Sequence, residues 1–280
     1  MGNFVNIARK EFADLVSSPM VLVVLAGYFV VLMLNFFMWC EGVPNMDLSI
    51  GFSHSYGMVF ADNLFAVLSS SYGPIVGVMI GCASIASERH NNALSILLTK
   101  PVYRDTIING KLLGSLLFLM LILGFSIILY TSCLFVFCGG AISSSTGDYV
   151  SRLPIIFAFS IILVAIYWMV AVLLSLLVKN TAFALITGSL LVFIAEFVSM
   201  SSFADMVSNL FPGQEFAISS FIVSLTPGGF LWPIREILFN SAYDLSQSLL
   251  LILPDMAKFS LYALTICVVS YIVFVRRDEA

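Results

Sequence analysis

Charged residues are scarce in this chain, and their scarcity excludes a soluble globular fold. Only 10% of the 280 residues are Asp, Glu, Lys or Arg, whereas 60% are hydrophobic, and the mean hydropathy is +1.06. Soluble domains carry about 25% charged residues. Because a soluble fold of this length cannot bury so much apolar surface, the solvent must be lipid. The composition therefore predicts an all-α polytopic membrane protein.

Basic, metal-binding and catalytic patterns are lacking as well. A net charge of −4 argues against a nucleic-acid partner, which needs a basic patch. No HExxH is present, and neither a serine elbow nor a paired-aspartate pattern occurs. We expect no catalytic residue, no metal site and no cofactor on this chain.

Cysteine is also sparse, and its pattern leaves one question open. The five cysteines are an odd number in no metal-like spacing, so they do not form a disulfide framework. Cys40 and Cys138 both fall near the predicted outer membrane surface, where they could pair. The alternative is that both are ordinary apolar fillers.

Long apolar runs are abundant. A span needs about 20 apolar residues to cross roughly 30 Å. Six runs qualify: residues 20–39, 66–87, 112–137, 154–178, 181–203 and 257–275. The first is too long for a signal peptide and has no small-residue cleavage site, so we expect an uncleaved anchor.

The distribution of Lys and Arg predicts the orientation of these spans. With both termini in the cytoplasm, nine basic residues lie inside and three lie outside, the three being Arg152, Arg235 and Lys258. The prediction is a multi-pass protein of the cytoplasmic membrane.

Three segments lie outside the spans. Residues 3–18 place apolar side chains at helical spacing between charges, which predicts an amphipathic helix on the inner membrane surface. Residues 41–65 show little apolar pattern and are expected to form an outer loop. Within a second outer loop, 204–250, the ten-residue run "FAISSFIVSL" reaches only about 15 Å as a helix, so it is expected to be interfacial or re-entrant.

A polar stretch, "SERHNNALSILLTKPVYRDTIINGK", occupies residues 87–111 between the second and third runs. Ser87 fits a helix N-cap and Glu88 its first turn, Pro101 ends that helix, and a second helix begins near Asp105. Connections in helical bundles usually take 2 to 8 residues, so about 24 residues with helical pattern indicate a docking role. We expect a short cytoplasmic helix lying crosswise beneath the membrane.

The same stretch resembles the signature region of ABC type-2 transporter permeases. The matching positions are Glu88, Arg89, Leu97, Leu98, Thr99, Pro101, Val102, Arg104, Gly110 and Lys111. The glycine usual after Glu-Arg and a spacer is replaced here by "HNNALS". "IARKEFADLVSSP" and "SLTPGGF" are similar to the family's surface helix and its last outer loop.

The resemblance implies a type V exporter fold: six spans, a surface helix first, and a coupling helix between spans two and three. It implies a permease that works as a dimer, either a homodimer or with a related permease, on a separate ABC ATP-binding subunit that holds ATP and Mg. In this chain "INGKLLGS" is not a phosphate-binding loop, because leucine follows Gly110-Lys111 and Asp105 stands at the upstream glycine position. The coupling residues implied are Glu88, Arg89, Asn92, Leu97, Leu98, Pro101 and Arg104.

Two further patterns suggest sites inside the bilayer. Gly73, Gly77 and Gly81 repeat every four residues, an arrangement that lets helix backbones approach closely, within the chain or across a dimer. Glu196 is the only acid deep in a span, where a charge costs about 2.5–3.5 kcal/mol on insertion scales. It either snorkels or pairs with Arg235, or it forms a polar spot in an exit path. Asn35, a polar residue in the first span, could likewise be paired or line a path, and burying its neutral side chain in lipid costs less free energy than burying a charge.

These patterns favour the permease subunit of an ATP-driven exporter. A self-sufficient secondary transporter or channel would commonly show inverted repeats and several midplane charges, neither of which is present. A membrane anchor that recruits a partner through residues 87–111 without transport is the third alternative. The sequence does not indicate the substrate.

Overall fold

The protein is a bundle of helices. The computed structural model describes residues 2–42, 55–70, 72–90, 104–178, 180–199, 201–210, 215–240 and 242–277, which contain no β-strand. The helices are α1 (Gly2–Ser17), α2 (Pro19–Gly42), α3 (Tyr56–Ser69), α4 (Tyr72–His90), α6 (Arg104–Phe137), α7 (Gly139–Ile142), α8 (Thr146–Leu177), α9 (Thr181–Val198), α10 (Ser201–Leu210), α11 (Glu215–Ser224), α12 (Pro227–Leu238) and α13 (Leu245–Arg277).

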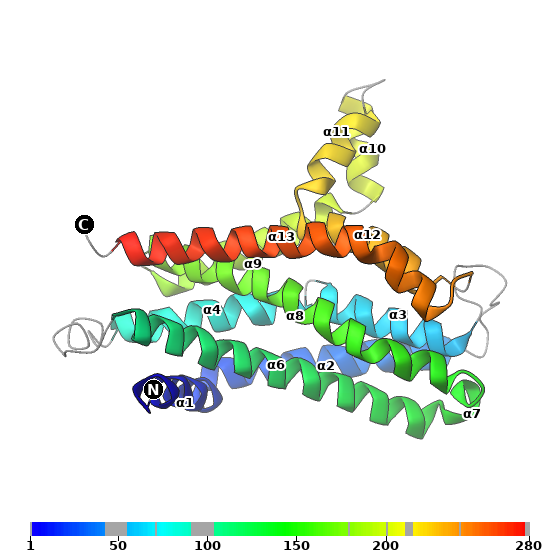
Figure 1. Cartoon of the computed structure of the whole chain (residues 1–280), viewed down its shortest axis with the longest axis horizontal. Helices are drawn as coiled ribbons and strands as arrows, with labels where there is room; N and C mark the ends of the chain where they lie inside the picture. The colour runs from blue at the N-terminus through cyan, green and yellow to red at the C-terminus, as the bar shows by residue number, and fades with distance from the viewer. Residues whose placement is uncertain are drawn as a thin grey trace.

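The long helices run side by side along one axis (Figure 1). The N-terminal helix α1, the last turn of α4, the first turn of α6 and the end of α13 lie at one end of the bundle. The short helix α7 and the first turns of α13 lie at the other end. Both described chain ends therefore lie on the same side, as the predicted orientation requires.

In the part of the chain that the structure describes, five segments are long and apolar enough to cross a membrane. They are Pro19–Gly42, Tyr56–Ser84, Asn109–Phe137, Thr146–Ser175 and Leu245–Val273. The apolar helix Ala182–Val198 is shorter, and as 17 residues it would reach about 25 Å. The all-helical membrane fold is confirmed, while the count of six spans stays a prediction.

The interpretation of residues 41–65 as a loop is wrong for residues 56–65, which form most of α3. The helix begins at Ser55, whose hydroxyl accepts a hydrogen bond from the Met58 amide at 3.3 Å. Phe60 and Leu64 have no exposed surface. The adjacent polar residues Asp62 and Asn63 interrupt the apolar pattern of this helix in the sequence, so the segment does not read as a buried helix. The predicted span 66–87 is correspondingly divided between α3 and α4.

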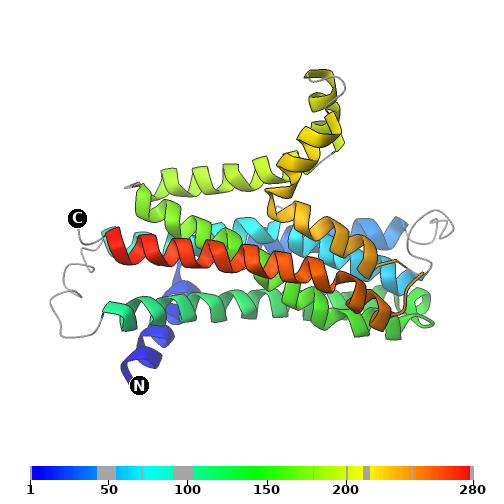
Figure 2. The same ribbon diagram turned by 45° about the horizontal axis from the view of Figure 1, so that its top comes forward.

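Several helices extend beyond their predicted spans. The runs 112–137 and 257–275 lie inside the longer helices α6 and α13, and the run 154–178 lies in α8 except for its last residue, Val178. Pro154 and Pro254 stand inside α8 and α13 instead of at their starts. The outer segment 204–250 includes most of α10 and all of α11, which form a hairpin projecting sideways from the bundle (Figures 1 and 2). Whether this hairpin is interfacial or re-entrant stays a prediction.

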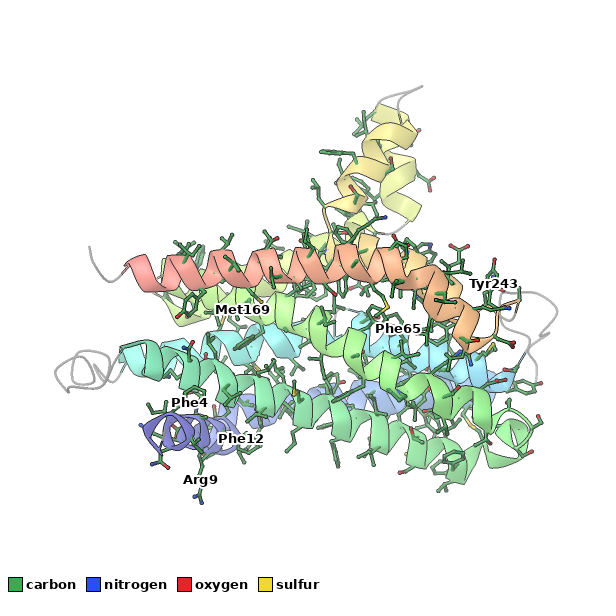
Figure 3. All side chains as sticks on the ribbon, viewed as in Figure 1. Phe4, Arg9, Phe12, Phe65, Met169 and Tyr243 are labelled. Atoms are coloured by element: carbon green, nitrogen blue, oxygen red, sulfur yellow. A yellow bond between two sulfur atoms is a disulfide. The ribbon has the colours of Figure 1, made fainter. Side chains whose placement is uncertain are left out.

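A helix is present over the predicted surface segment as α1, and its apolar side faces α6. Its position on the inner membrane surface stays a prediction. Phe12 packs edge-on against Phe118 with ring centroids 5.6 Å apart, while Arg9 points away from the bundle (Figure 3). A Cβ at Gly110 would meet the Ile7 side chain at 2.9 Å, and one at Gly114 would meet the Ala8 carbonyl oxygen at 2.6 Å. The two glycines therefore let α1 cross directly against α6.

A disulfide joins Cys40 of α2 to Cys138 at the end of α6, and it decides the alternative that the sequence left open. The Cα atoms are 6.6 Å apart, within the range that disulfides span. Cys138 directly precedes α7, which lies at the end of the bundle away from α1 (Figure 1). The predicted topology places the oxidising side of the membrane at that end.

Thiol counting tests this bridge. A maleimide reagent added to the denatured, unreduced protein is expected to label three cysteines, Cys82, Cys133 and Cys267, and all five after reduction, as read by mass spectrometry. In a Cys40→Ser variant, Cys138 loses its partner, so four thiols should label without reductant. Five labelled thiols in the unreduced wild-type protein would show that the bridge does not form.

Candidate functional site

The glycine stripe of α4 lies against α8 of the same chain. A Cβ at Gly77 would meet the Val164 carbonyl oxygen at 2.7 Å, and one at Gly81 would meet the Trp168 carbonyl oxygen at 2.6 Å. A Cβ at Gly73 would collide with the Leu68 carbonyl of α3 and reach the Val164 side chain at 3.4 Å. The stripe thus serves packing inside the subunit, with α8 as the neighbour.

A buried ion pair joins three helices at the end of the bundle where α1 lies. The Lys111 ammonium on α6 lies 3.0 Å from the Glu11 carboxylate on α1, and it donates a hydrogen bond of 3.1 Å to the Ser84 carbonyl on α4. The two side chains are 15% and 8% exposed. Because a buried charge needs a partner, this contact holds α1, α4 and α6 in one arrangement.

The polar stretch 87–111 lies between two of these helices. The helix α4 continues to His90, so the interpretation of Ser87 as an N-cap is wrong: Ser87, Glu88 and Arg89 lie in its last turns, with no proline or glycine after Gly81 to stop it. The helix expected near Asp105 begins as α6 at Arg104. Asn92, Leu97, Leu98 and Pro101 lie outside the described residues.

A cavity of about 240 Å³ opens between α3, α4, α8, α9 and α12. Phe65, which is fully buried, points from α3 into the bundle interior beside it (Figure 3). Apolar walls alternate with polar groups, and the cavity is lined by Phe65, Ala66, Ser69, Ser70, Pro74, Leu163, Tyr167, Val192, Ala195, Glu196, Ser199, Gly228, Leu231, Trp232 and Arg235.

Glu196 and Arg235 both line this cavity, but Arg235 has another carboxylate as its partner. Its Nε and one terminal nitrogen donate to the two oxygens of Asp62 at 2.5 and 2.9 Å, a bidentate pair between α12 and α3. The hydrogen bonds to Asp62 raise the pKa of Arg235 above its ordinary value, so the guanidinium stays charged.

Asn35 lies apart from Glu196. It stands on α2 and does not line the cavity, and its Oδ1 is buried without a hydrogen-bond partner among the described residues. The structure therefore does not bring these two intramembrane candidates together. Among the described residues, no group of three or more His, Cys, Asp or Glu side chains could hold a metal ion.

Comparison with known proteins shows the family to which this chain belongs. The family model described as "ABC-2 family transporter protein" matches residues 5–279, nearly the whole chain. The chain belongs to the ABC-2 transporter family. It is a membrane permease, a transport component that is not itself catalytic. No curated protein matches this permease.

Sequence reasoning missed the polar contacts that organise this permease. Asp62 was assigned to an outer loop and Arg235 was considered only as a partner of Glu196, although the two form the pair of α3 and α12. Glu11 is one of the charges between the apolar positions of residues 3–18 and is not singled out by the sequence, yet it is buried. The available signal was the GxxxG spacing of Gly110 and Gly114, which marks close helix contact and so predicts a buried neighbour for Lys111.

Arg152 is a second buried cation that the sequence did not single out. It is 2% exposed, and it donates to the carbonyls of Leu238 and Asp148 at 3.1 and 2.9 Å. The bond to Leu238 fastens the end of α12 to α8, and the bond to Asp148 lies within α8. Arg152 therefore fixes one wall of the cavity without touching it.

Proposed function

We propose that this permease is the membrane-spanning subunit of an ATP-driven exporter in the cytoplasmic membrane. A separate ABC ATP-binding subunit, which carries ATP and Mg, docks at residues 88–111. The permease works as a pair, with a second copy or a related permease. Both termini face the cytoplasm, as the nine-to-three distribution of basic residues favours.

The contact of Lys111 with α1 and α4 is the observation that carries the proposal. The helices on either side of the docking segment, α4 and α6, are joined to each other and to the surface helix α1 through one ammonium group. A displacement of the segment by a docked ATPase is therefore passed to three helices together. Because the three helices are joined at this end, a movement of residues 88–111 would move them together. This arrangement favours a coupling role for the segment over a role as a passive linker.

The test is recovery of the ATPase by the permease. Reversing two charges together, Glu88→Arg with Arg89→Glu, keeps the net charge and should leave membrane insertion unchanged. It is expected to reduce co-purification of the cognate ATPase by at least tenfold, because like-charge contacts at a docked surface cost several kcal/mol. A matched control, Asp255→Lys with Lys258→Asp, reverses an exposed pair on α13 and should leave recovery unchanged.

The outcomes separate the alternatives. Equal ATPase recovery from both double variants would make residues 88–111 a linker and overturn the proposal. Transport that persists without any ATPase would indicate a self-sufficient secondary transporter. An ATPase that binds but drives no movement of any compound would indicate a recruiting anchor.

A further inference from the structure

We propose that the side of α1 that carries Val5, Arg9 and Val16 binds an anionic phospholipid of the inner leaflet, with the Arg9 guanidinium on the headgroup phosphate. The inference rests on the proposed function, because it takes the end of the bundle where α1 lies as the cytoplasmic end. At this end the permease then has a lipid partner in addition to the ATPase.

Two contacts with α6 show how α1 is turned about its own axis. Ile7 lies against Gly110, where an added Cβ would meet its side chain at 2.9 Å. Phe12 packs on Phe118 with ring centroids 5.6 Å apart. Phe118 stands eight positions beyond Gly110, or about 12 Å further along the apolar segment Asn109–Phe137. The Phe12 side of α1 therefore faces the middle of the spans, and the Ile7 side faces the end of the bundle.

Val5, Arg9 and Val16 lie on the Phe12 side. Positions 5, 9, 12 and 16 follow the spacing of a single helix face. The two valines are 60% and 44% exposed, so the subunit itself does not cover them. Figures 1 and 2 show α1 crossing the direction of the long helices. Exposed apolar side chains that face the spans from a crossing helix are typical of contact with lipid acyl chains.

Arg9 supplies a positive charge beside these valines. It is exposed and points away from the bundle (Figure 3). Among the residues that the structure describes, no carboxylate lies within ion-pair distance of Arg9, and the Glu11 carboxylate on the same helix is 3.0 Å from the Lys111 ammonium. An arginine stem covers apolar surface while its head reaches the headgroup level. The planar guanidinium matches a phosphate through two parallel hydrogen bonds.

A phospholipid fits this side of α1 better than the ATPase does. The proposed docking segment, residues 88–111, joins the ends of α4 and α6, so a docked ATPase approaches from the end of the bundle. The Ile7 side of α1 faces that way, and at helical spacing from Ile7 it carries the exposed residues Lys10 and Asp14. The Phe12 side faces the spans, where the surrounding medium is lipid.

Binding of two matched lipids to the purified, delipidated permease tests the proposal. Dioleoyl phosphatidylglycerol and dioleoyl phosphatidylcholine share their acyl chains and differ in headgroup charge. Native mass spectrometry in one detergent gives the dissociation constant of the first lipid bound. The anionic lipid is expected to bind at least about fivefold more tightly, because one basic side chain at an anionic surface is worth about this factor. Equal binding of the two lipids would overturn the proposal in the wild-type protein alone.

Variants locate the site. Arg9→Gln is expected to abolish the fivefold preference for the anionic lipid. Lys10→Gln removes the same charge from the neighbouring position, which faces the end of the bundle, and should leave the preference intact. Arg9→Lys keeps the charge without the planar pair of donors, so its preference should lie between those of the wild-type protein and Arg9→Gln. If Arg9→Gln keeps the preference, or if Lys10→Gln loses as much of it, α1 attracts anions only through its overall charge and the proposal is wrong.

Two further arms separate this lipid site from its alternatives. Soluble glycerophosphate carries the phosphate without acyl chains and is expected not to displace phosphatidylglycerol; displacement would show a phosphate site and overturn the lipid assignment. If Arg9→Gln keeps the lipid preference but lowers recovery of the ATPase, this side of α1 binds the ATPase instead. Because lipid binding is measured without an ATPase, its failure leaves the co-purification result untouched, and loss of ATPase docking leaves lipid binding untouched.

Discussion

A Lys111→Met permease is expected to unfold at a markedly lower temperature than the wild-type protein and to lose stimulation of its ATPase. The substitution keeps the length of the side chain but removes its charge, and with it the 3.0 Å contact to the buried carboxylate of Glu11, which is 8% exposed. Breaking a buried ion pair by removing one partner costs about 3–5 kcal/mol. We expect the lower end, because Lys111 retains 15% exposure.

The same substitution is expected to weaken the coupling between the ATPase and the membrane helices. The Ser84 carbonyl also loses its donor, so α4 and α6 are no longer fastened together beside the docking segment. ATP hydrolysis by the reconstituted complex should then proceed without stimulation by the permease. A double variant, Glu11→Lys with Lys111→Glu, should recover only part of the stability, because the new carboxylate at position 111 cannot donate to Ser84.

The control uses the exposed pair of Lys258 and Asp255. Lys258 is 65% exposed, so Lys258→Met should change stability by no more than about 1 kcal/mol. Thermal unfolding in one detergent measures all the variants. Equal unfolding temperatures for Lys111→Met and Lys258→Met would show that the buried pair does not stabilise the bundle.

Replacing Gly77 with leucine is expected to destabilise the permease by about 1–3 kcal/mol or to prevent its folding. A Cβ there would lie 2.7 Å from the Val164 carbonyl oxygen and 2.9 Å from the Val164 Cγ1, so α4 and α8 must move apart. Overpacking of a close contact costs about this much. Gly77→Ala should show a smaller loss in the same direction, because backbone atoms cannot yield as a flexible side chain does.

The matched control is Gly27→Leu on α2, where a Cβ would meet nothing within 4 Å. It should leave the unfolding temperature of the subunit unchanged. Size-exclusion chromatography with light scattering records the oligomeric state in parallel. If Gly77→Leu remains as stable as the wild-type protein but dissociates into single subunits, the stripe makes a subunit contact and its packing on α8 is wrong.

The apolar pattern predicted the helices well, and its failures have a common cause. The spans around residues 20–39, 112–137 and 257–275 are all helical, because lipid leaves the backbone no other way to satisfy its hydrogen bonds. The prediction failed at residues 56–65, where Asp62 and Asn63 suggested a loop. Their polar groups are instead bonded to Arg235 and Tyr130, the latter at 2.7 Å.

The site was predictable only in its components. Glu196 was singled out because a lone acid in a span is costly, and it does line the cavity. Its expected partner Arg235 is bound to Asp62, which lies 173 positions away in the sequence. No local pattern can predict a pairing at that separation, because it depends on how α3 and α12 meet.

The sequence by itself determined that this protein is embedded in lipid and that its chain is helical. It also determined that the polar segment 87–111 stands between the second and third apolar runs. These properties follow from composition and from periodicity within single helices, which are local. Only the tertiary structure decided that the glycine stripe faces α8, that Lys111 joins α1 and α4, and that Glu196 opens onto a cavity. Those facts depend on which helices become neighbours. Neighbours in a membrane are decided by close backbone approach and buried polar partners, not by hydrophobicity, which is high in every one of the long helices that could span the membrane.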